Sequence, residues 1–448
     1  MTTLSLVIVI VFITSYFFIA IESVTRVNKA AVALLMFVAC WTLFMIDPSQ
    51  YLPAAAGESI GNMVGSEMER HLGSTSTTLF FLMGAMTIVE LVDQNGGFNF
   101  VRDWVKTRHK RILLWRVAFL TFLLSAILDN LTTSIVMIMI LRKLIPEQND
   151  RFKYAALVII AANSGGAFSP IGDVTTIMLW NKGVITAAGV MTELLLPSLV
   201  SMVVPAYIIS LSLKGTMDIS EIRKDNTDDE DLTTGQRKAV FYIGVGGLVF
   251  VPIFKILTHL PPFVGILLVL GLLWTITEIF YRKLPETNNN RKGTMKRVIT
   301  MLKRIDMSTI LFFLGILMSV ACLETIGVLT QMGHGLNDTF NSNHYAVTGI
   351  IGVLSSIVDN VPLVAGCMGM YPVEAAGNMA VDGIFWQLLA YCAGVGGSIL
   401  IVGSAAGVVV MGLEKISFGW YMKHISWIAF AGYIAGMLCY RAEHLLLF

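Results

Sequence analysis

An Asp-Asn pair occurs twice in this chain, each time near the middle of a long apolar stretch. The first pair is Asp129-Asn130, and the second, 230 positions later, is Asp359-Asn360. Charged and strongly polar side chains at membrane depth are rare unless they face a wet cavity, a partner or an ion. The repeated pair therefore indicates one ion site that is built from two related halves.

The composition places both pairs in a membrane. Of the 448 residues, 55% are hydrophobic and only 14% are charged, which is far too apolar for a soluble protein of this length. A net charge of +1 gives no support for a nucleic-acid partner, and we expect none. We predict an all-α polytopic membrane protein that uses no cofactor and is not an enzyme.

Ten apolar segments have about the 20 residues that a helix needs to cross a bilayer. They span residues 4–21, 30–46, 77–93, 154–184, 190–213, 239–258, 263–280, 308–325, 384–412 and 424–441. Two further apolar blocks, 112–145 and 345–372, carry the Asp-Asn pairs, and loops of matching charge character flank the two ends of each. We therefore predict that both blocks are re-entrant hairpins, which enter and leave the membrane by the same face.

A wider repeat surrounds the two hairpins. Residues 78–84 (TLFFLMG) align with 309–315 (TILFFLG), and Gly165-Gly166 aligns with Gly396-Gly397. Each half then has three spans, a hairpin, a glycine-interrupted span and a last span. Because this gives an odd number of crossings, the second copy is inverted, as in many secondary transporters. The predicted domains are 1–213 and 239–448, joined by a cytoplasmic linker at 214–238.

The distribution of Lys and Arg predicts the orientation. Loops 94–111 and 281–307 are rich in basic residues and are expected in the cytoplasm, whereas loops 326–344 and 373–383 contain none. Both termini are then predicted on the outer side. Two amphipathic segments, 97–110 and 328–340, are predicted to lie along the two membrane interfaces.

The glycine-interrupted spans, 154–184 and 384–412, are predicted to be broken helices. Pro170 and the glycines disrupt the helical hydrogen bonds, and free carbonyls are tolerated at membrane depth only where they are buried in protein or line a cavity. The first span carries Asp173, while the matching position of the second is Ser404. The main cation site is therefore expected in the first half.

Three acidic residues thus lie deep in the predicted membrane: Asp129, Asp173 and Asp359. Carboxylate, amide, hydroxyl and carbonyl oxygens suit a hard cation such as Na⁺ or Li⁺. Burial disfavours the charged form of a carboxylate, so a proton and a cation compete to neutralise it, and that competition is sufficient for exchange. Nearby hydroxyls either help the site or simply bond to their own helix: Thr132, Thr133, Thr175, Thr176, Ser355 and Ser398.

Residues 125–135, 163–176 and 355–364 closely resemble the NhaD-type sodium/proton antiporters, within the ion transporter superfamily that includes dicarboxylate and arsenite carriers. The resemblance covers nearly the whole chain. It implies a scaffold and a transport domain in each protomer, a homodimer and a location in the bacterial inner membrane. It also implies a functional set: Asp129, Asn130, Asn163, Asp173, Thr175, Thr176, Ser355, Asp359 and Asn360.

We therefore predict a secondary transporter that exchanges cytoplasmic Na⁺ or Li⁺ for external H⁺ by alternating access. The predicted Na⁺ ligands are Asp129, Asn130, Asn163 and Asp173. Thr132 is added to the ion- and proton-binding set, and the secondary candidates are Ser164, Ser169, Ser398, Glu90 and Glu193.

Three other functions were weighed against exchange. A sodium-coupled carboxylate symporter shares the architecture, but an Asp at both hairpin tips repels an anion. A cation channel uses carboxylates too, yet broken helices and hairpins suit alternating access better. An intramembrane aspartyl protease needs two aspartates that share a proton. Gly172-Asp173 matches such a site no better than chance would.

Overall fold

The computed structural model describes residues 2–20, 25–52, 60–97, 107–145, 148–213, 215–216, 232–282, 307–340, 343–357 and 359–447. Within these ranges the regular structure is helical, apart from one isolated β-bridge between His109 and Thr216. The predicted all-α class is therefore confirmed. Most of the acidic linker and of the amphipathic segment 97–110 falls outside the described residues.

Helices occupy the positions of the uninterrupted predicted spans. In the described part of the chain, six helices are long and apolar enough to cross a membrane: α4, α6, α10, α11, α12 and α15. The last two helices, which are bent by 54° at their junction, pass the same test as a pair. The helices outside the Asp-Asn blocks and the glycine-interrupted segments include α1 (Thr3–Ala20), α3 (Lys29–Phe44), α4 (Ile60–Gln94), α10 (Ala187–Leu211), α11 (Thr234–Thr258), α12 (Pro262–Arg282), α15 (Met307–Thr325), α21 (Phe418–His424) and α22 (Ser426–Leu447). A short 3₁₀ turn, η1 (Pro48–Gln50), follows α3.

The two Asp-Asn blocks each form a pair of helices that is interrupted at the aspartate. The first pair is α6 (Lys110–Leu128) with α7 (Asn130–Leu144), and the second is α17 (His344–Ser355) with α18 (Asn360–Met370). Helices α7, α17 and α18 have 15, 12 and 11 residues, fewer than the roughly 20 that a crossing requires. The lengths of α17 and α18 suit a re-entrant hairpin, whereas α6 with its 19 residues is long enough to cross by itself. The placement of both hairpins relative to a bilayer stays a prediction.

The two glycine-interrupted segments are broken helices. The first consists of α8 (Gln148–Ala167) and α9 (Val174–Lys182), and the second of α19 (Ile384–Gly396) and α20 (Ala405–Glu414). Pro170 lies in the first break, where a residue without an N–H removes no helical hydrogen bond. Both breaks expose helix ends in the interior of the chain.

The first helix of each hairpin packs closely on the broken helix of the same half. A side chain at Gly165 would collide with the Phe122 carbonyl of α6, and one at Gly396 would collide with the Gly352 carbonyl of α17. A serine hydroxyl crosses each joint: Ser125 donates to the Ala162 carbonyl at 2.6 Å, and Ser355 donates to the Ala393 carbonyl at 2.8 Å. Both halves therefore use the same joint between hairpin and broken helix.

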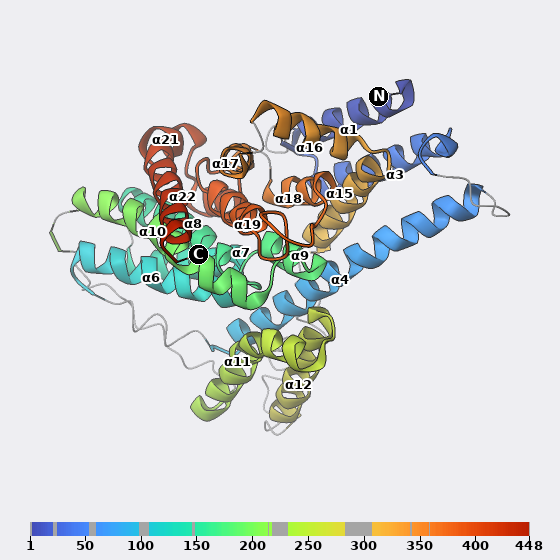
Figure 1. The fold of residues 1–448 in the computed structure, drawn as a ribbon. Helices are drawn as coiled ribbons and strands as arrows, with labels where there is room; N and C mark the ends of the chain where they lie inside the picture. The colour runs from blue at the N-terminus through green and yellow to red at the C-terminus, as the bar shows by residue number, and fades with distance from the viewer. Residues whose placement is uncertain are drawn as a thin grey trace.

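Figure 1 shows how these elements are arranged. The hairpins and broken helices, α6–α9 and α17–α20, occupy the middle of the molecule, and we call them the hairpin unit. Helices α1, α3 and α15 pack together on one side of it, and α4 runs obliquely to α11 and α12. We call α1, α3, α4, α11, α12 and α15 the frame. Helices α10 and α22 pack on each other and on the broken helices.

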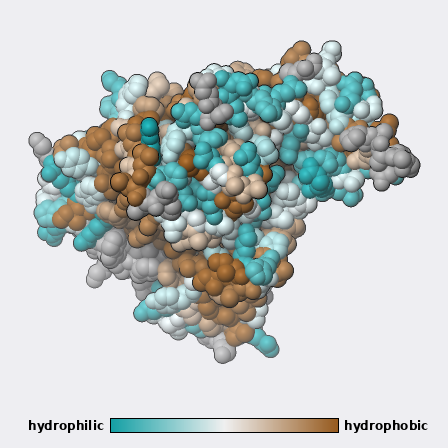
Figure 2. Space-filling view, in the orientation of Figure 1, coloured by the Kyte–Doolittle hydropathy of each residue, from teal (hydrophilic) through white to brown (hydrophobic). Residues whose placement is uncertain are grey.

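Apolar side chains gather on the outer surface of the frame and of α22. Figure 2 shows hydrophobic surface over α11 and α12 and again over α22. Phe250, Ile253 and Leu257 of α11 and Leu272 of α12 are exposed there, as is Trp427 of α22. Exposed apolar surface of this extent suits contact with lipid rather than water. Together with the long apolar helices, it identifies a multi-pass membrane protein.

A buried ion cluster joins the two halves of the hairpin unit. The carboxylate of Glu414, at the end of α20, is fully buried and accepts from Arg142 of α7 at 2.8 Å and from Arg151 of α8 at 3.0 Å. At the repeat counterpart of Arg151, the Asp382 carboxylate accepts from the Thr186 amide at 2.6 Å. Polar contacts thus join the two halves of the chain at both of these repeat-related positions.

Candidate functional site

The four helices that follow the breaks of the hairpin unit, α7, α9, α18 and α20, each begin at a polar capping residue. Each cap accepts a hydrogen bond from the first turn of its helix, where unpaired N–H groups and the helix dipole favour negative charge. Asp129 caps α7, Asp173 caps α9, Asp359 caps α18 and Ser404 caps α20. The three aspartates predicted at membrane depth are thus all N-caps, and the fourth equivalent position holds a neutral hydroxyl.

Asp173 is the centre of a buried polar cluster. Its Oδ2 accepts from Asn130 Nδ2 at 2.7 Å, and its Oδ1 accepts from the backbone N–H and the hydroxyl of Thr175, both at 2.9 Å. Asn360 Nδ2 lies 3.4 Å from both carboxylate oxygens. Both Asp-Asn pairs therefore place their asparagine beside the same carboxylate, one from each half of the chain.

Asn163 extends this cluster into the second half. Its Oδ1 accepts from Asn130 at 3.1 Å, and its Nδ2 lies 2.9 Å from the hydroxyls of Ser398 and Ser404. The broken helices come close together beside it, since a side chain at Gly394 would press against Ala167. The site is therefore shared between α7, α8, α9, α18 and the break between α19 and α20.

The cluster is almost completely shielded from solvent. Asn163 is fully buried, Asp173 is 1% exposed, and Asn130 and Asn360 are 6% and 5% exposed. Among the described residues, no basic side chain lies within ion-pair distance of Asp173. The carboxylates of Asp129 and Asp359 are near enough to repel its charge. A buried carboxylate without a basic partner is costly, and a proton or a bound cation would neutralise the charge that the hydrogen bonds to Asp173 stabilise only in part.

The chemistry of the donors suits a small hard cation. The cluster offers carboxylate, amide and hydroxyl oxygens, and an asparagine amide can present either its oxygen or its NH₂ group. In the described part of the chain there is no group of three or more His, Cys, Asp or Glu side chains that could hold a metal ion. The arrangement therefore favours an alkali cation held by neutral oxygens and one carboxylate over a transition metal.

Asp129 lies beside this cluster with a strained backbone. Its φ is 112° and its ψ is 157°, a region that residues with a side chain rarely adopt. Both carboxylate oxygens are held by Thr132, through its N–H at 2.7 Å and its hydroxyl at 2.8 Å. The side chain is partly exposed, so it can receive a proton or a cation.

Asp359 faces the frame instead. Its backbone N–H donates to the Tyr16 hydroxyl of α1 at 3.1 Å, and its Oδ2 lies 4.0 Å from Nζ of Lys29, the first residue of α3. The Lys29 ammonium also lies over the Phe312 ring of α15, 4.4 Å from its centroid. Of the two asparagine-aspartate pairs, the second thus has its asparagine in the cluster and its aspartate against a basic frame residue.

The remaining predicted residues lie at the edge of the cluster or apart from it. Thr176 donates to the Asp173 carbonyl, and Ser398 reaches Asn163, whereas Ser355, Ser164 and Ser169 bond to neighbouring helices through Ala393, Ser201 and Ala126. Glu193 accepts from Tyr440 at 3.0 Å where α10 meets α22, and Glu90 accepts from Gln94 on α4. The structure does not bring Glu193 into the cluster.

Three residues near the site are not among the predicted site residues. Ser404 had a usable signal, since it is the repeat counterpart of Asp173 and therefore belongs at the start of α20. Lys29 and Tyr16 had none, because they lie far from either motif and reach Asp359 only through the packing of α1 and α3. The frame therefore contributes to the second tip in a way that the repeat does not indicate.

Comparisons with known proteins agree on the class. The profile of the family described as "Citrate transporter" matches residues 16–388. Sodium/proton antiporter 1 of Arabidopsis thaliana is 44% identical over 93% of this chain and 69% of its own length. Sodium/proton antiporter 2 of the same plant is 42% identical over 96% and 97%. The Na(+)/H(+) antiporter NhaD of Vibrio parahaemolyticus is 33% identical over 80% of this chain and 88% of its own.

A solved structure shares the fold. The YdaH transporter of Alcanivorax borkumensis matches 93% of this chain and 98% of its own with a TM-score of 0.56, at 10% sequence identity. At that identity the likeness concerns the fold alone. A multi-pass helical transporter fold is thus common to both chains.

Proposed function

The chain belongs to the citrate-transporter family and is an NhaD-type transporter, and from this premise we propose that it exchanges cytoplasmic Na⁺ or Li⁺ for external H⁺. The relatives named as sodium/proton antiporters cover most of the chain and support the ion pair. The buried cluster around Asp173 supports the mechanism.

The observation that carries the proposal is the isolated carboxylate of Asp173. It is 1% exposed and is surrounded by the amides of Asn130 and Asn360 and the hydroxyl of Thr175. A proton and a Na⁺ ion each cancel its single charge, and together they would over-neutralise it. Binding of one ion therefore displaces the other, and this competition is enough to couple Na⁺ transport to H⁺ transport.

Asp129 is proposed as the second exchanging group. It caps α7 and lies partly exposed next to the cluster, with Thr132 holding both of its oxygens. With the site open to the cytoplasm, Na⁺ displaces protons from Asp129 and Asp173. The hairpin unit then moves against the frame, and external protons reload the carboxylates and release Na⁺.

Movement of the hairpin unit as one body is supported by its internal fastenings. The Glu414 ion cluster joins α20 to α7 and α8, and the serine joints hold each hairpin on its broken helix. The inverted repeat is proposed from the sequence repeat, and alternating access from the hairpins and broken helices. The outward-facing termini are proposed from the distribution of Lys and Arg, and the homodimer and the bacterial inner membrane from the family resemblance.

A carboxylate carrier is the second candidate, since the matching family profile is described as a citrate transporter. A site for citrate needs basic side chains or free N–H groups directed at the substrate. Here the acidic caps Asp129, Asp173 and Asp359 already occupy three helix N-termini. The electrostatics therefore favour a cation over an anion as the transported species.

The test is Na⁺-driven proton movement in proteoliposomes that contain the purified protein and a trapped pH dye. We expect Na⁺ or Li⁺ alone to collapse an imposed pH gradient. Asp173→Asn should slow this exchange by about 100-fold, since it removes the charge that both ions neutralise. Asp338→Asn, an exposed aspartate on α16 (Val328–Thr339), is the matched control and should exchange like wild type.

Two results would overturn the proposal. If the wild-type protein moves protons only when citrate accompanies Na⁺, the chain is a symporter. If Asp173→Asn exchanges as fast as Asp338→Asn, the Asp173 carboxylate is not the group for which Na⁺ and H⁺ compete.

A further inference from the structure

A polar cavity lies between the frame and the hairpin unit, apart from the Asp173 cluster. Its volume is about 90 Å³, room for several water molecules at about 30 Å³ each. Helices α4 and α15 of the frame form one wall, and α9 and α18 of the hairpin unit form the other. The polar and charged residues that line it include Arg70, His71, Ser74, Asn181, Lys182 and Glu324.

The cavity is lined by two helices, α9 and α18, whose first turns lie at the buried cluster. Met178 lines it and lies five positions after Asp173 on α9, and Ala365 lines it five positions after Asn360 on α18. At 1.5 Å per residue, each is roughly 8 Å along its helix from the cluster. The lining of the cavity thus comes to within roughly 8 Å of the cluster, measured along these two helices.

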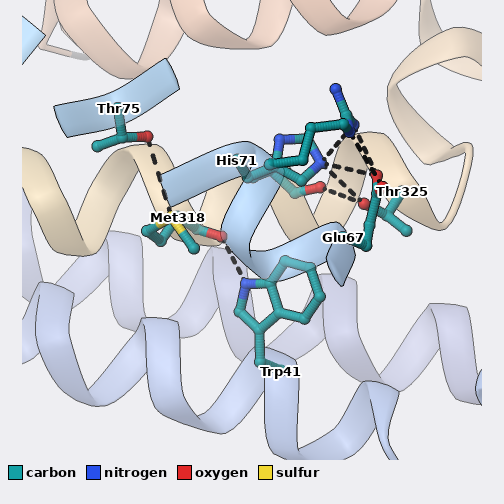
Figure 3. Close-up of polar contacts among 8 residues, drawn as sticks. Trp41, Glu67, His71, Thr75, Met318 and Thr325 are labelled. Carbon is teal, nitrogen blue, oxygen red and sulfur yellow. Dashed lines mark hydrogen bonds and ion pairs between the residues drawn. The ribbon is translucent and has the colours of Figure 1, made fainter. Parts of the chain in front are cut away.

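His71 is the buried titratable group of the cavity wall. It is 7% exposed, and Figure 3 shows its ring facing Glu67 of its own helix and Thr325 of α15. Its Nε2 lies 2.9 Å from Arg70 Nη2, 3.1 Å from Glu67 Oε1 and 3.2 Å from Thr325 Oγ1. Arg70 also donates to both oxygens of Glu67, at 2.6 and 3.0 Å.

The protonation of Nε2 determines which of these neighbours it bonds. A guanidinium can only donate, and a carboxylate can only accept. Without a proton, Nε2 accepts from Arg70 and opposes Glu67, whereas with a proton it donates to Glu67 and opposes Arg70. A single nitrogen that faces one obligate donor and one obligate acceptor therefore changes partner whenever it gains or loses a proton.

Groups with opposite effects surround His71: burial and the Arg70 guanidinium oppose a proton on its ring, whereas the carboxylates of Glu324 and Glu67 favour one. On α15 the charged group is Glu324, whose carboxylate favours the positively charged forms of both His71 and Arg70. Helix α9 contributes the ammonium of Lys182 to the cavity lining. On α18 the lining residues are the apolar Ala365 and Met368. Trp41 of α3 packs against the imidazole, and both Trp41 and Thr75 bond to Met318, which fixes the helices around the ring (Figure 3).

We propose that this cavity is the external vestibule of the transporter and that His71 is its proton-loading residue, which receives protons from cavity water before they reach Asp173. Water transfers a proton to Nε2, the imidazolium donates to Glu67, and the same proton later returns to cavity water nearer the cluster. No other co-reactant is needed. The inference rests on the proposed exchange and adds the side from which the protons enter.

His71→Gln in proteoliposomes tests the role, assayed for Na⁺-driven proton exchange over a series of pH values. Glutamine keeps a hydrogen-bonding group but takes up no proton, so we expect the rate to fall about tenfold at neutral and mildly acid pH, where His71 of the wild type can hold a proton, and little at alkaline pH, where its imidazole is neutral. The Na⁺ concentration for half-maximal rate should stay at the wild-type value. Thr325→Val, which removes the bond to α15 without removing a titratable group, should leave the pH profile unchanged.

The outcomes separate this inference from the proposed function. If the wild type exchanges and His71→Gln has the same pH profile, His71 is only a structural contact and the exchange stands. If Thr325→Val shifts the profile as much as His71→Gln, the bond to α15 explains the effect and the inference fails. If the wild type shows no exchange, the proposed function fails first.

Access to the vestibule is tested independently. A Ser74→Cys variant places a thiol in the cavity wall, and we expect a small charged thiol reagent to label it from the outer side of the membrane. The control is Ser76→Cys, two positions along α4, outside the cavity lining. Labelling of Ser74→Cys only from the cytoplasmic side would overturn the assignment of the cavity as external.

Discussion

The two hairpin tips have the same sequence pair but different surroundings. In the first tip, Asp129 adopts a φ of 112° and is held by Thr132 of its own hairpin. In the second tip, Asp359 has an ordinary φ of −48° and lies 4.0 Å from Lys29 of the frame. Both adjacent asparagines approach Asp173, at 2.7 Å from the first tip and at 3.4 Å from the second.

The difference shows how a repeated fold can hold two unequal sites. A carboxylate beside an ammonium already has a counter-charge, so it has less need of a proton or a metal ion. Among the described residues, Asp129 has no basic partner within ion-pair distance. We therefore expect the first tip to exchange ions and the second tip to connect the hairpin unit with the frame.

The largest expected effect comes from neutralising each tip in turn. Asp129→Asn should lower the rate of Na⁺-driven exchange by about 100-fold, and Asp359→Asn by less than about tenfold, because only the first removes an unpaired charge. The measurement is dye-detected exchange in proteoliposomes at equal protein density. Equal losses in the two variants would contradict the unequal roles.

A smaller difference is expected between the two asparagines. Asn130→Ala removes a 2.7 Å bond to Asp173 and a 3.1 Å bond to Asn163, whereas Asn360→Ala removes contacts of 3.4 Å. Hydrogen bonds to a charged group contribute about 1.5–3 kcal/mol, so Asn130→Ala should weaken apparent Na⁺ affinity by about tenfold or more. Asn360→Ala should weaken it by about two- to threefold, since its geometry is poorer. The concentration of Na⁺ at half-maximal rate measures both, and a greater loss for Asn360→Ala would reverse the ranking.

The smallest expected effect concerns Lys29. Lys29→Met removes the ammonium and leaves Asp359 free to attract a cation, so apparent Na⁺ affinity should rise by about two- to threefold, the size typical of a partly exposed ion pair. Lys29→Arg keeps the charge and should match wild type. An unchanged Na⁺ dependence in Lys29→Met would mean that Lys29 does not neutralise Asp359 in the working protein.

The sequence predicts the helix breaks well because their causes are local. The Asp-Asn pairs in blocks 112–145 and 345–372 coincide with the breaks between α6 and α7 and between α17 and α18. The glycines and Pro170 likewise locate the break between α8 and α9. A capping aspartate, a proline and a glycine act on the backbone within a few residues, so no tertiary information is needed to place them.

The partners of each site residue could not be predicted, because they depend on packing between distant segments. Asn163 reaches Ser404 across 241 positions, and Asp359 reaches Tyr16 across 343. The repeat indicates that two tips exist and that Ser404 replaces Asp173. It does not indicate which tip lies against Lys29, since the contacts of Tyr16 and Lys29 with Asp359 depend on how α1 and α3 pack.

The backbone of Asp129 has a consequence for how this protein tolerates change. A non-glycine residue held at φ 112° costs about 1–3 kcal/mol of folding stability. Asp129→Gly should therefore melt at a higher temperature than the wild type while losing ion exchange. Thermal stability therefore favours glycine at position 129, whereas ion exchange requires the aspartate.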